Sequence, residues 1–338
     1  MKTQPHTRQL KNLSQSGFAA ILVTLIVVGI MTLITIGFVL VVSREGRDSL
    51  DRQLSTQAFY AAETAVNDAR DLLANEIIDT EGKDDCDVDE ADGWTPILSA
   101  DESIQYTCVL LDFELDRLFY QNIPTDYNRP IYLNTVAAGS GTPTPIGDIT
   151  LRWRSAPASS ETTNLSSGDT FPSNPDSDTH PVLRITITPL DDMSREELIA
   201  NTFTTFLKPT EGGNDTSVSY FSGQPADQGT IQQVDCNGMC EFSIDNLGFT
   251  NALMTVRAVY SEAELTILPS SEDVLFADEQ FAVDATGKAS DVLRRIQVRL
   301  PVVDRPPLPS FAIEANRICK PYGVYPGGYD SQDDECIY

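Results

Sequence analysis

The N-terminal part of the chain contains one long, uninterrupted apolar run. From Phe18 to Val42, 25 residues follow one another without a formal charge. About 20 apolar residues, each rising 1.5 Å along a helix, cross a typical hydrocarbon core, so this run is long enough to span a bilayer. The leader before it holds three basic and no acidic residues. The positive-inside rule therefore places residues 1–17 in the cytoplasm and the chain from about residue 43 onward outside.

Beyond this run the apolar pattern becomes one-sided instead of ending. Apolar residues recur mostly at three- and four-residue steps, which indicates a helix with one apolar stripe. No proline occurs between residues 18 and 78, and Gly82 is the expected stop. We predict one continuous helix on the order of 90 Å long, transmembrane over 18–42 and amphipathic over 43–80. Its stripe consists of Leu50, Leu54, Ala58, Ala61, Ala65 and Leu72, with Ala62, Val66, Ala69, Leu73 and Ile77 beside them.

Two ordinary explanations of the apolar run differ in what they predict. A cleaved secretory signal has an apolar region of roughly 7–15 residues and a small-x-small site after it. The present run is longer, and no such site follows Val42. An uncleaved signal anchor fits the apolar run and stays open as an alternative.

From about residue 84 to residue 300, short β-like runs alternate with turn-rich connections. These runs mix apolar and polar residues and are rich in Thr, Val, Ile and Tyr. A long helix followed by such runs predicts an α+β fold, with the helix packed on a mainly antiparallel β head. Residues 278–300 are expected to form a hairpin that turns at 286–288. The predicted strands are 103–111, 130–136, 148–154, 181–188, 201–207, 229–236, 240–245, 252–261, 263–269 and 294–302.

Three segments are expected to lack a core of their own. Residues 155–181 are rich in Ser, Thr, Pro, Asp and Asn and predict a flexible surface loop. Residues 208–217 are a candidate boundary between two lobes of the head. Residues 301–338 form a tail rich in Pro, Gly and Tyr, which a disulfide would have to order.

All six cysteines follow the apolar run, and an even number on the outer side of a membrane predicts disulfides. Six cysteines allow 15 pairings. Nearest-neighbour pairing closes each loop locally and is the hypothesis adopted here. It gives Cys86–Cys108, Cys236–Cys240 and a Cys319–Cys336 bridge that closes the tail. A zinc site is disfavoured, since the C-x3-C pair at 236 and 240 has no second close pair.

The charge balance and motifs argue against several classes of function. A formal charge of −27 repels phosphate backbones, so no nucleic-acid partner is expected. The candidate basic residues are Arg152, Arg154, Arg294, Arg295 and Arg299, which alternation places on solvent faces of strands. No phosphate-binding glycine motif occurs, and His180 is the one histidine beyond the leader. We therefore expect no enzyme, since a Ser–His–Asp triad would have to use that residue.

Calcium is the one cofactor for which the sequence offers candidates. Asp85, Asp87 and Asp89 stand at alternate positions, and oxygen-rich clusters suit this ion. The EF-hand spacing fails, because Glu90 stands at its sixth position and Pro96 at its twelfth. A solvated acidic turn is the alternative interpretation, and no other cofactor is expected.

Two stretches carry a family resemblance. A short basic leader ends in Gly17, followed by Phe18 and an apolar helix, and residues 55–73 read STQAFYAAETAVNDARDLL. The first resembles the class III signal of type IV pilins and of the pseudopilins of type II secretion. The second is similar to the N-terminal pattern of minor pilins of the PilX type. Together the two stretches cover residues 16–73, about a sixth of the chain.

The resemblance implies a maturation route. A prepilin peptidase would cut between Gly17 and Phe18, and the new amino group of Phe18 would be methylated. The protein would sit in the cytoplasmic membrane as a single-pass, N-in protein. An inner-membrane assembly platform would then draw it into a cell-surface filament for assembly, adhesion or motility. Its N-terminal helix would pack there against other pilins or pseudopilins.

One position departs from the family pattern. Many pilins have a glutamate four residues after the mature first residue, and this chain has Leu22 there. That glutamate is thought to pair with a neighbouring subunit's N-terminal amine inside the filament, where an unpaired charge is costly. Its loss favours a minor or tip subunit over an abundant one. The nearest alternative is a tip pseudopilin of type II secretion, since the large K-type pseudopilin also lacks that glutamate. A membrane-anchored extracellular binding module is another.

Overall fold

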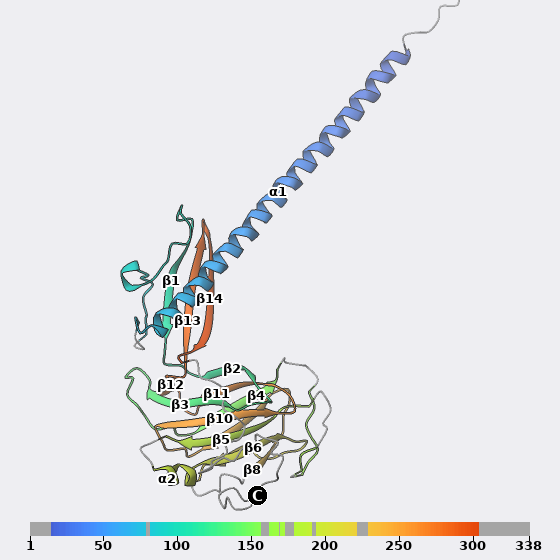
Figure 1. The fold of residues 1–338 in the computed structure, drawn as a ribbon. Coiled ribbons are helices and arrows are strands. Elements are labelled where there is room, and N and C mark those ends of the chain that lie inside the picture. Colours follow the sequence, from blue (N-terminus) through green and yellow to red (C-terminus); the bar gives the residue numbers. More distant parts are fainter. Residues whose placement is uncertain are drawn as a thin grey trace, which may run out of the picture. The chain divides into compact units, whose positions relative to one another are not determined.

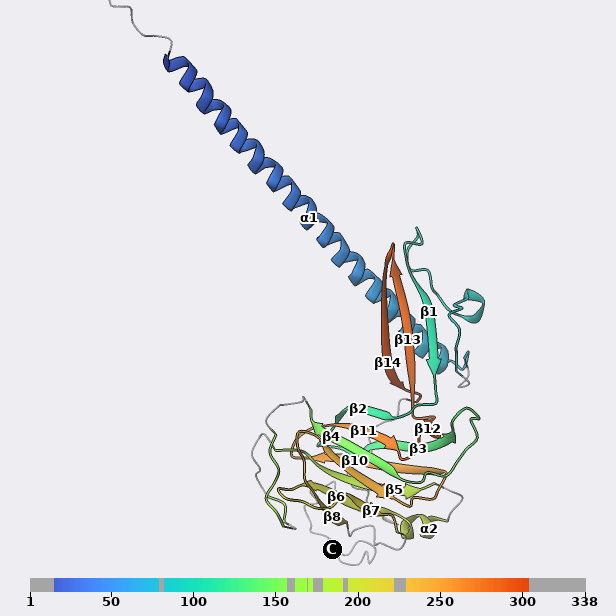
Figure 2. The same ribbon diagram turned by 180° about the vertical axis from the view of Figure 1, so that it is seen from behind.

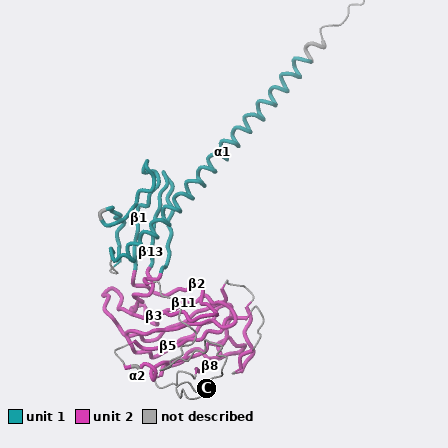
Figure 3. The backbone as a smooth tube through the Cα atoms, viewed as in Figure 1, with its two compact units in different colours: residues 1–112, 282–300 teal, residues 113–281, 301–338 magenta. Residues whose placement is uncertain are grey.

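A computed structural model describes residues 15–78, 82–156, 162–168, 170–172, 179–190, 194–221 and 229–303. The chain forms two compact units (Figure 3). Unit 1 comprises residues 1–112 and 282–300, and unit 2 comprises residues 113–281 and 301–338. Most of unit 2 is therefore an insertion in the sequence of unit 1. The suggested boundary at 208–217 lies inside unit 2, and the chain divides elsewhere.

The predicted long helix is present as α1 (Gln15–Ala74), drawn in blue in Figure 1. Its 60 residues correspond to a length on the order of 90 Å. The helix is long and apolar enough to cross a membrane, as expected for residues 18–42. It ends earlier than residue 80. Glu76 adopts a left-handed φ of 56°, and the amides of Glu76 and Ile77 donate to the carbonyls of Leu73 and Leu72.

This ending is a Schellman-type cap, which satisfies carbonyls in the last turn of the helix. Glycine usually occupies the left-handed position of such a cap, because it has no Cβ to clash there. Here glutamate occupies it. The sequence therefore has no glycine at the end of α1, and the prediction extended the helix toward Gly82, the next glycine along the chain.

Unit 1 also contains a three-stranded sheet in the order β1-β13-β14. Its strands are β1 (Ile104–Asp112), β13 (Gln280–Ala289) and β14 (Val292–Pro301), and a short 3-10 helix, η1 (Glu90–Asp92), precedes β1. β1 and β13 pair antiparallel, with Tyr106 opposite Gly287. The pairing then shifts so that Cys108 lies opposite Thr286, which leaves Thr107 as an extra residue in β1.

The predicted hairpin exists, but the predicted position of its turn is wrong. β13 continues through residues 286–288, and the turn falls after Ala289, where Ser290 has a φ of 56°. Thr286-Gly287-Lys288 looks like a turn because glycine commonly supplies a positive φ. In the structure Gly287 is a strand residue, and its missing side chain serves the contact with α1 described below.

The described residues of unit 2 form two β-sheets and one short helix. The six-stranded sheet has the order β12-β3-β10-β5-β6-β8, and the five-stranded sheet has the order β2-β11-β4-β9-β7. Pairing is antiparallel except between β6 and β8 and between β7 and β9. The elements are β2 (Leu118–Ile123), β3 (Arg129–Ala137), β4 (Ile149–Ser155), β5 (Val182–Pro189), α2 (Arg195–Ala200), β6 (Phe203–Pro209), β7 (Ser217–Ser219), β8 (Thr230–Val234), β9 (Cys240–Asp245), β10 (Asn251–Val259), β11 (Ala263–Pro269) and β12 (Val274–Ala277).

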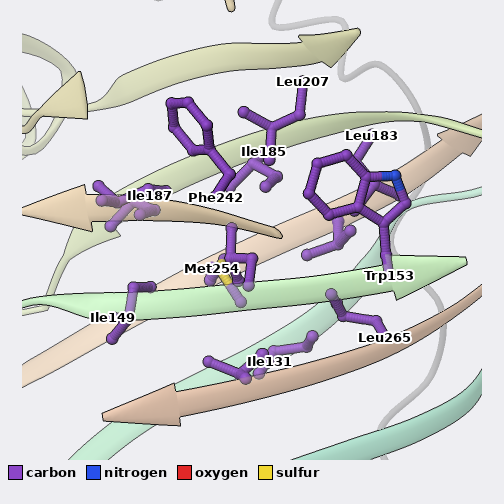
Figure 4. Packing of buried hydrophobic residues seen from close by; sticks show 14 of the residues in the cluster. Ile131, Ile149, Trp153, Leu183, Ile185, Ile187, Leu207, Phe242, Met254 and Leu265 are labelled. Atoms are coloured by element: carbon purple, nitrogen blue, oxygen red, sulfur yellow. The ribbon is translucent and has the colours of Figure 1, made fainter. Parts of the chain in front are cut away.

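The core of unit 2 lies between its two sheets. Figure 4 shows Trp153 of β4 close to Leu183 of β5, with Met254 of β10 in the same cluster. The indole Nε1 of Trp153 donates to the carbonyl oxygen of Pro181 at 2.9 Å, so its polar atom is satisfied inside the core. Inward residues alternate with partly exposed ones along β10 and β11, as the period of a strand requires.

The prediction of a flexible surface loop at 155–181 is wrong for the parts around Leu165 and His180. Thr163 pairs with Thr179, and Leu165 pairs with Thr210 beside β6. Leu165 is buried, and His180 has no exposed surface. Lys208, also fully buried, donates from Nζ to three carbonyl oxygens of this segment, those of Ser166, Gly168 and Thr170, at 3.0, 2.6 and 3.0 Å. Polar composition alone did not indicate this anchoring, because the interaction comes from a distant strand.

Candidate assembly surface on helix α1

The N-terminal part of α1 has no apolar partner within the described structure. Its side chains from Ala20 to Val42 are exposed, and Leu22 retains 47 % of its surface. A helix that is apolar on all sides is stable only where lipid or other apolar surface covers it. The Gly17–Phe18 bond lies in the first turn of α1, which begins at Gln15. This arrangement leaves the whole apolar segment available for lipid or for other helices.

The C-terminal part of α1 has two different faces. The alanines between residues 58 and 69 point toward the sheet of unit 1, where each is at most 1 % exposed, whereas Phe59 and Tyr60 retain 46 % and 60 % of their surface. The buried set is Ala58, Ala61, Ala62, Ala65 and Ala69. The alanines of the motif at 55–73 therefore form the contact with the sheet, and its aromatic pair faces outward.

The alanine face allows α1 and β13 to touch backbone to backbone. A Cβ placed on Gly287 would lie 2.0 Å from the carbonyl oxygen of Ala58 and 2.4 Å from the amide nitrogen of Ala62. No real Cβ fits at such distances. Glycine on the strand and alanine on the helix are thus both required by the same close approach.

A polar cluster fixes α1 at a second point. The Tyr106 hydroxyl and the Thr95 hydroxyl both donate to Asp68 Oδ2, at 2.7 and 2.6 Å, and the Thr95 amide donates to the Tyr106 oxygen at 2.7 Å. Trp94 packs edge-on against the Tyr106 ring, with 6.4 Å between the ring centroids. Burial, reinforced by the nearby Asp68 carboxylate, raises the pKa of Tyr106. Sequence analysis missed this cluster, since nothing in the spacing links the three residues.

Two of the three predicted disulfides are confirmed. Cys86 is bonded to Cys108 of β1, and Cys236 is bonded to Cys240 at the start of β9. The predicted Cys319–Cys336 pair lies outside the described residues, as does the tail from residue 304 onward.

The calcium candidates do not form a site in the described part of the chain, where no three His, Cys, Asp or Glu side chains gather into a metal-binding group. Asp85 forms an ion pair with Lys83, which lowers the pKa of the Asp85 carboxyl through hydrogen bonding. The Asp87 amide donates to Asp85 Oδ1 at 3.3 Å. Local partners thus occupy part of the acidic turn that contains Asp85, Asp87 and Asp89.

His180, the one histidine considered for a catalytic triad, is fully buried. Neither ring nitrogen of His180 has a hydrogen-bond partner within the described structure, and burial lowers its pKa.

The two arginines of β4 lie at partly exposed positions. Arg152 and Arg154 form ion pairs at 2.7 Å with Glu241 and Glu264, which stand opposite them on β9 and β11. These contacts agree with the expected solvent-facing strand positions.

Comparison with known proteins gives no relative: no protein family, curated protein or solved structure matches this chain. The geometry of α1 is therefore the main basis for a functional proposal.

Proposed function

We propose that this chain is a minor type IV pilin-like subunit of a cell-surface filament. Prepilin peptidase would cut it between Gly17 and Phe18, and Phe18 would be methylated. The subunit would wait in the cytoplasmic membrane with its N-terminus inside. It would then enter the filament through the apolar half of α1.

The observation that carries this proposal is the division of α1 into two halves. Residues 20–42 are apolar and exposed, while the alanines from Ala58 to Ala69 are buried against the sheet of unit 1. One rigid helix thus joins a folded unit to a segment that needs lipid or other apolar helices. This is what a subunit needs if it is to move from a bilayer into a helical filament core.

The absent glutamate at Leu22 supports a minor or tip position. A subunit without this carboxylate cannot pair with the amine of a neighbouring subunit in the apolar core. The same feature favours the second candidate, a tip pseudopilin of type II secretion. An extracellular binding module on an uncleaved anchor is the third candidate, for which unit 2 would be the binding part.

The test is the location of the protein and the phenotype of its loss. We expect it in filaments sheared from the cell surface, and we expect its deletion to reduce piliation, twitching or adhesion. Loss of exoenzyme secretion with normal piliation would instead favour the pseudopilin. Retention of the protein in the membrane fraction, with none of these phenotypes, would favour the anchored module.

A further inference from the structure

The three-stranded sheet of unit 1 protects its two edges very differently. The outer edge of β1 is covered by the preceding chain. Lys83 and Leu111 exchange backbone hydrogen bonds of 2.9 and 3.0 Å, and the amides of Leu98 and Tyr106 donate to Ile104 and Pro96. The Cys86–Cys108 disulfide ties the covering segment to the strand.

β14 forms the opposite edge, as Figures 1 and 2 show. It has ten residues, and in the described ranges no strand lies on its outer side. Its one proline, Pro301, is its last residue. Proteins block an edge by short strands, prolines, bulges, covering elements or charged side chains. β14 is long and has no proline before its last residue, so its outer backbone groups are suited to pair with a strand that complements its charges.

The charged side chains of β14 itself are all basic. The charged residues of β14 are Arg294, Arg295 and Arg299, in a chain with a formal charge of −27. A hollow of about 470 Å³ lies between α1 and the strand, and among the described residues that line it the charged ones are Arg294 and Arg295. Arg294 Nε donates to the Ser55 hydroxyl at 2.8 Å, and Arg295 pairs with Asp284. Phe59, Tyr60 and Ile296 supply the apolar part of the lining.

This charge pattern identifies the kind of strand that fits. Pairing with β14 of a second copy would set one basic strand beside another, and like charges across strands are destabilising. Side chains alternate along β14, so Arg294 lies on the face toward α1, where it bonds to Ser55, and Arg295 and Arg299 lie on the other face. Acidic side chains of a partner strand would meet Arg295 and Arg299 favourably. Because side chains alternate along a strand, apolar residues between its acids would reach Ile296 and Phe59. We propose that β14 binds an extended segment of a partner protein, with alternating acidic and apolar residues, as a fourth strand of this sheet.

The test uses a defined peptide and the full-length protein in a neutral detergent. The probe is a fluorescein-labelled peptide of four Val-Glu repeats, followed by fluorescence anisotropy. A Val-Lys peptide and a Val-Glu peptide with alternate N-methylated amides are the controls. We expect both controls to bind at least about tenfold more weakly, since the first has the wrong charge and the second lacks donors for strand pairing.

Protein variants test the strand directly. Arg299→Glu, on the face of β14 that the acids would meet, should weaken binding of the Val-Glu peptide about tenfold, whereas Arg70→Glu, the same change on α1 outside the hollow, should leave affinity unchanged. Unaltered tryptophan fluorescence would show that both variants fold. Equal binding of the N-methylated peptide would overturn the proposal, because attraction would then be by charge alone.

Two further results would overturn it in favour of other occupants. Binding by a chain truncated after Val303, without binding by the full chain, would assign the edge to the protein's own C-terminal segment. Self-association that the Val-Glu peptide reverses would assign it to a second copy. Absence of binding in both the full and the truncated chain would also refute the proposal. These results do not depend on whether the chain enters a filament.

Discussion

Gly287 of β13 faces the backbone of Ala58 in α1 so closely that a Cβ on the glycine would lie 2.0 Å from the alanine carbonyl oxygen. Helix α1, whose N-terminal part is apolar and exposed, is therefore held in its C-terminal part by backbone contact with β13. Such a contact tolerates no side chain on the strand and only small ones on the helix. It makes the orientation of α1 on the unit 1 sheet a rigid feature.

The first prediction concerns this contact. Gly287→Ala should destabilise unit 1 by about 3 kcal/mol, because backbone atoms of α1 must move to admit the methyl group. Gly147→Ala is the matched control, since a Cβ there meets only Ser270 Oγ at 3.8 Å. Denaturant unfolding followed by fluorescence measures both changes. An effect of Gly287→Ala no larger than that of the control would contradict the contact.

The two tryptophans of the chain allow the units to be followed separately. Trp94 is buried in unit 1 and Trp153 in unit 2. A Trp153→Phe background reports unit 1, and a Trp94→Phe background reports unit 2. Each prediction below is measured against the corresponding single-tryptophan parent.

The second prediction is a loss of stability of unit 1 in alkali. The pKa of Tyr106 is raised from its ordinary value of 10.0, chiefly by burial. Above pH 10 the unfolded state loses this proton while the folded state keeps it, so stability falls as pH rises. Tyr106→Phe should flatten the dependence between pH 9 and about 11 that Trp94 reports. If the parent and the variant show the same slope, the hydroxyl does not titrate in this way.

The third prediction concerns acid and unit 2. Burial lowers the pKa of His180 from 6.5, so below pH 6.5 the unfolded state binds a proton that the folded state does not. Stability of unit 2 should therefore fall as pH drops from about 6.5 toward 5. His180→Leu should remove this fall, as read from Trp153. The carboxyl groups titrate mostly at lower pH, and persistence of the slope in the variant would assign it to them.

The fourth prediction concerns the lysine that anchors the segment before β5. Lys208→Met keeps the length of the buried side chain but leaves three carbonyls without this donor, which should destabilise unit 2 by about 3 kcal/mol. Hydrogen exchange should rise at residues 164–172. Lys288→Met, a change at a partly exposed lysine of unit 1, is the control. Unchanged exchange in the segment would mean that other contacts hold it.

The sequence predicted those parts of the fold that local patterns encode. The long helix follows from an apolar run and a stripe, and β10 follows from strict alternation. Short strands such as β2, β7 and β12 were missed, because three to six residues give too little periodicity. Nearest-neighbour pairing of cysteines succeeded at Cys86–Cys108 and Cys236–Cys240, since both loops close locally.

Features that depend on distant pairing could not be predicted in this way. β1 pairs with β13 across the whole insertion of unit 2, for example Leu110 with Asp284. No local pattern marks residues 112 and 282, between which unit 2 is inserted. The role of Gly287 depends on the same pairing, because only the folded sheet brings it under α1. Lys208 was likewise assigned to the candidate boundary at 208–217, because no local pattern links it to the segment near Gly168 whose carbonyl it binds.

The central claim is that the mature protein keeps α1 and begins at Phe18. The most direct measurement is mass spectrometry of the N-terminus after the full chain is produced together with a prepilin peptidase. We predict a product that starts at a methylated Phe18 and retains the entire apolar segment. A protein that still starts at Met1, or one cut beyond the apolar segment, would contradict the account.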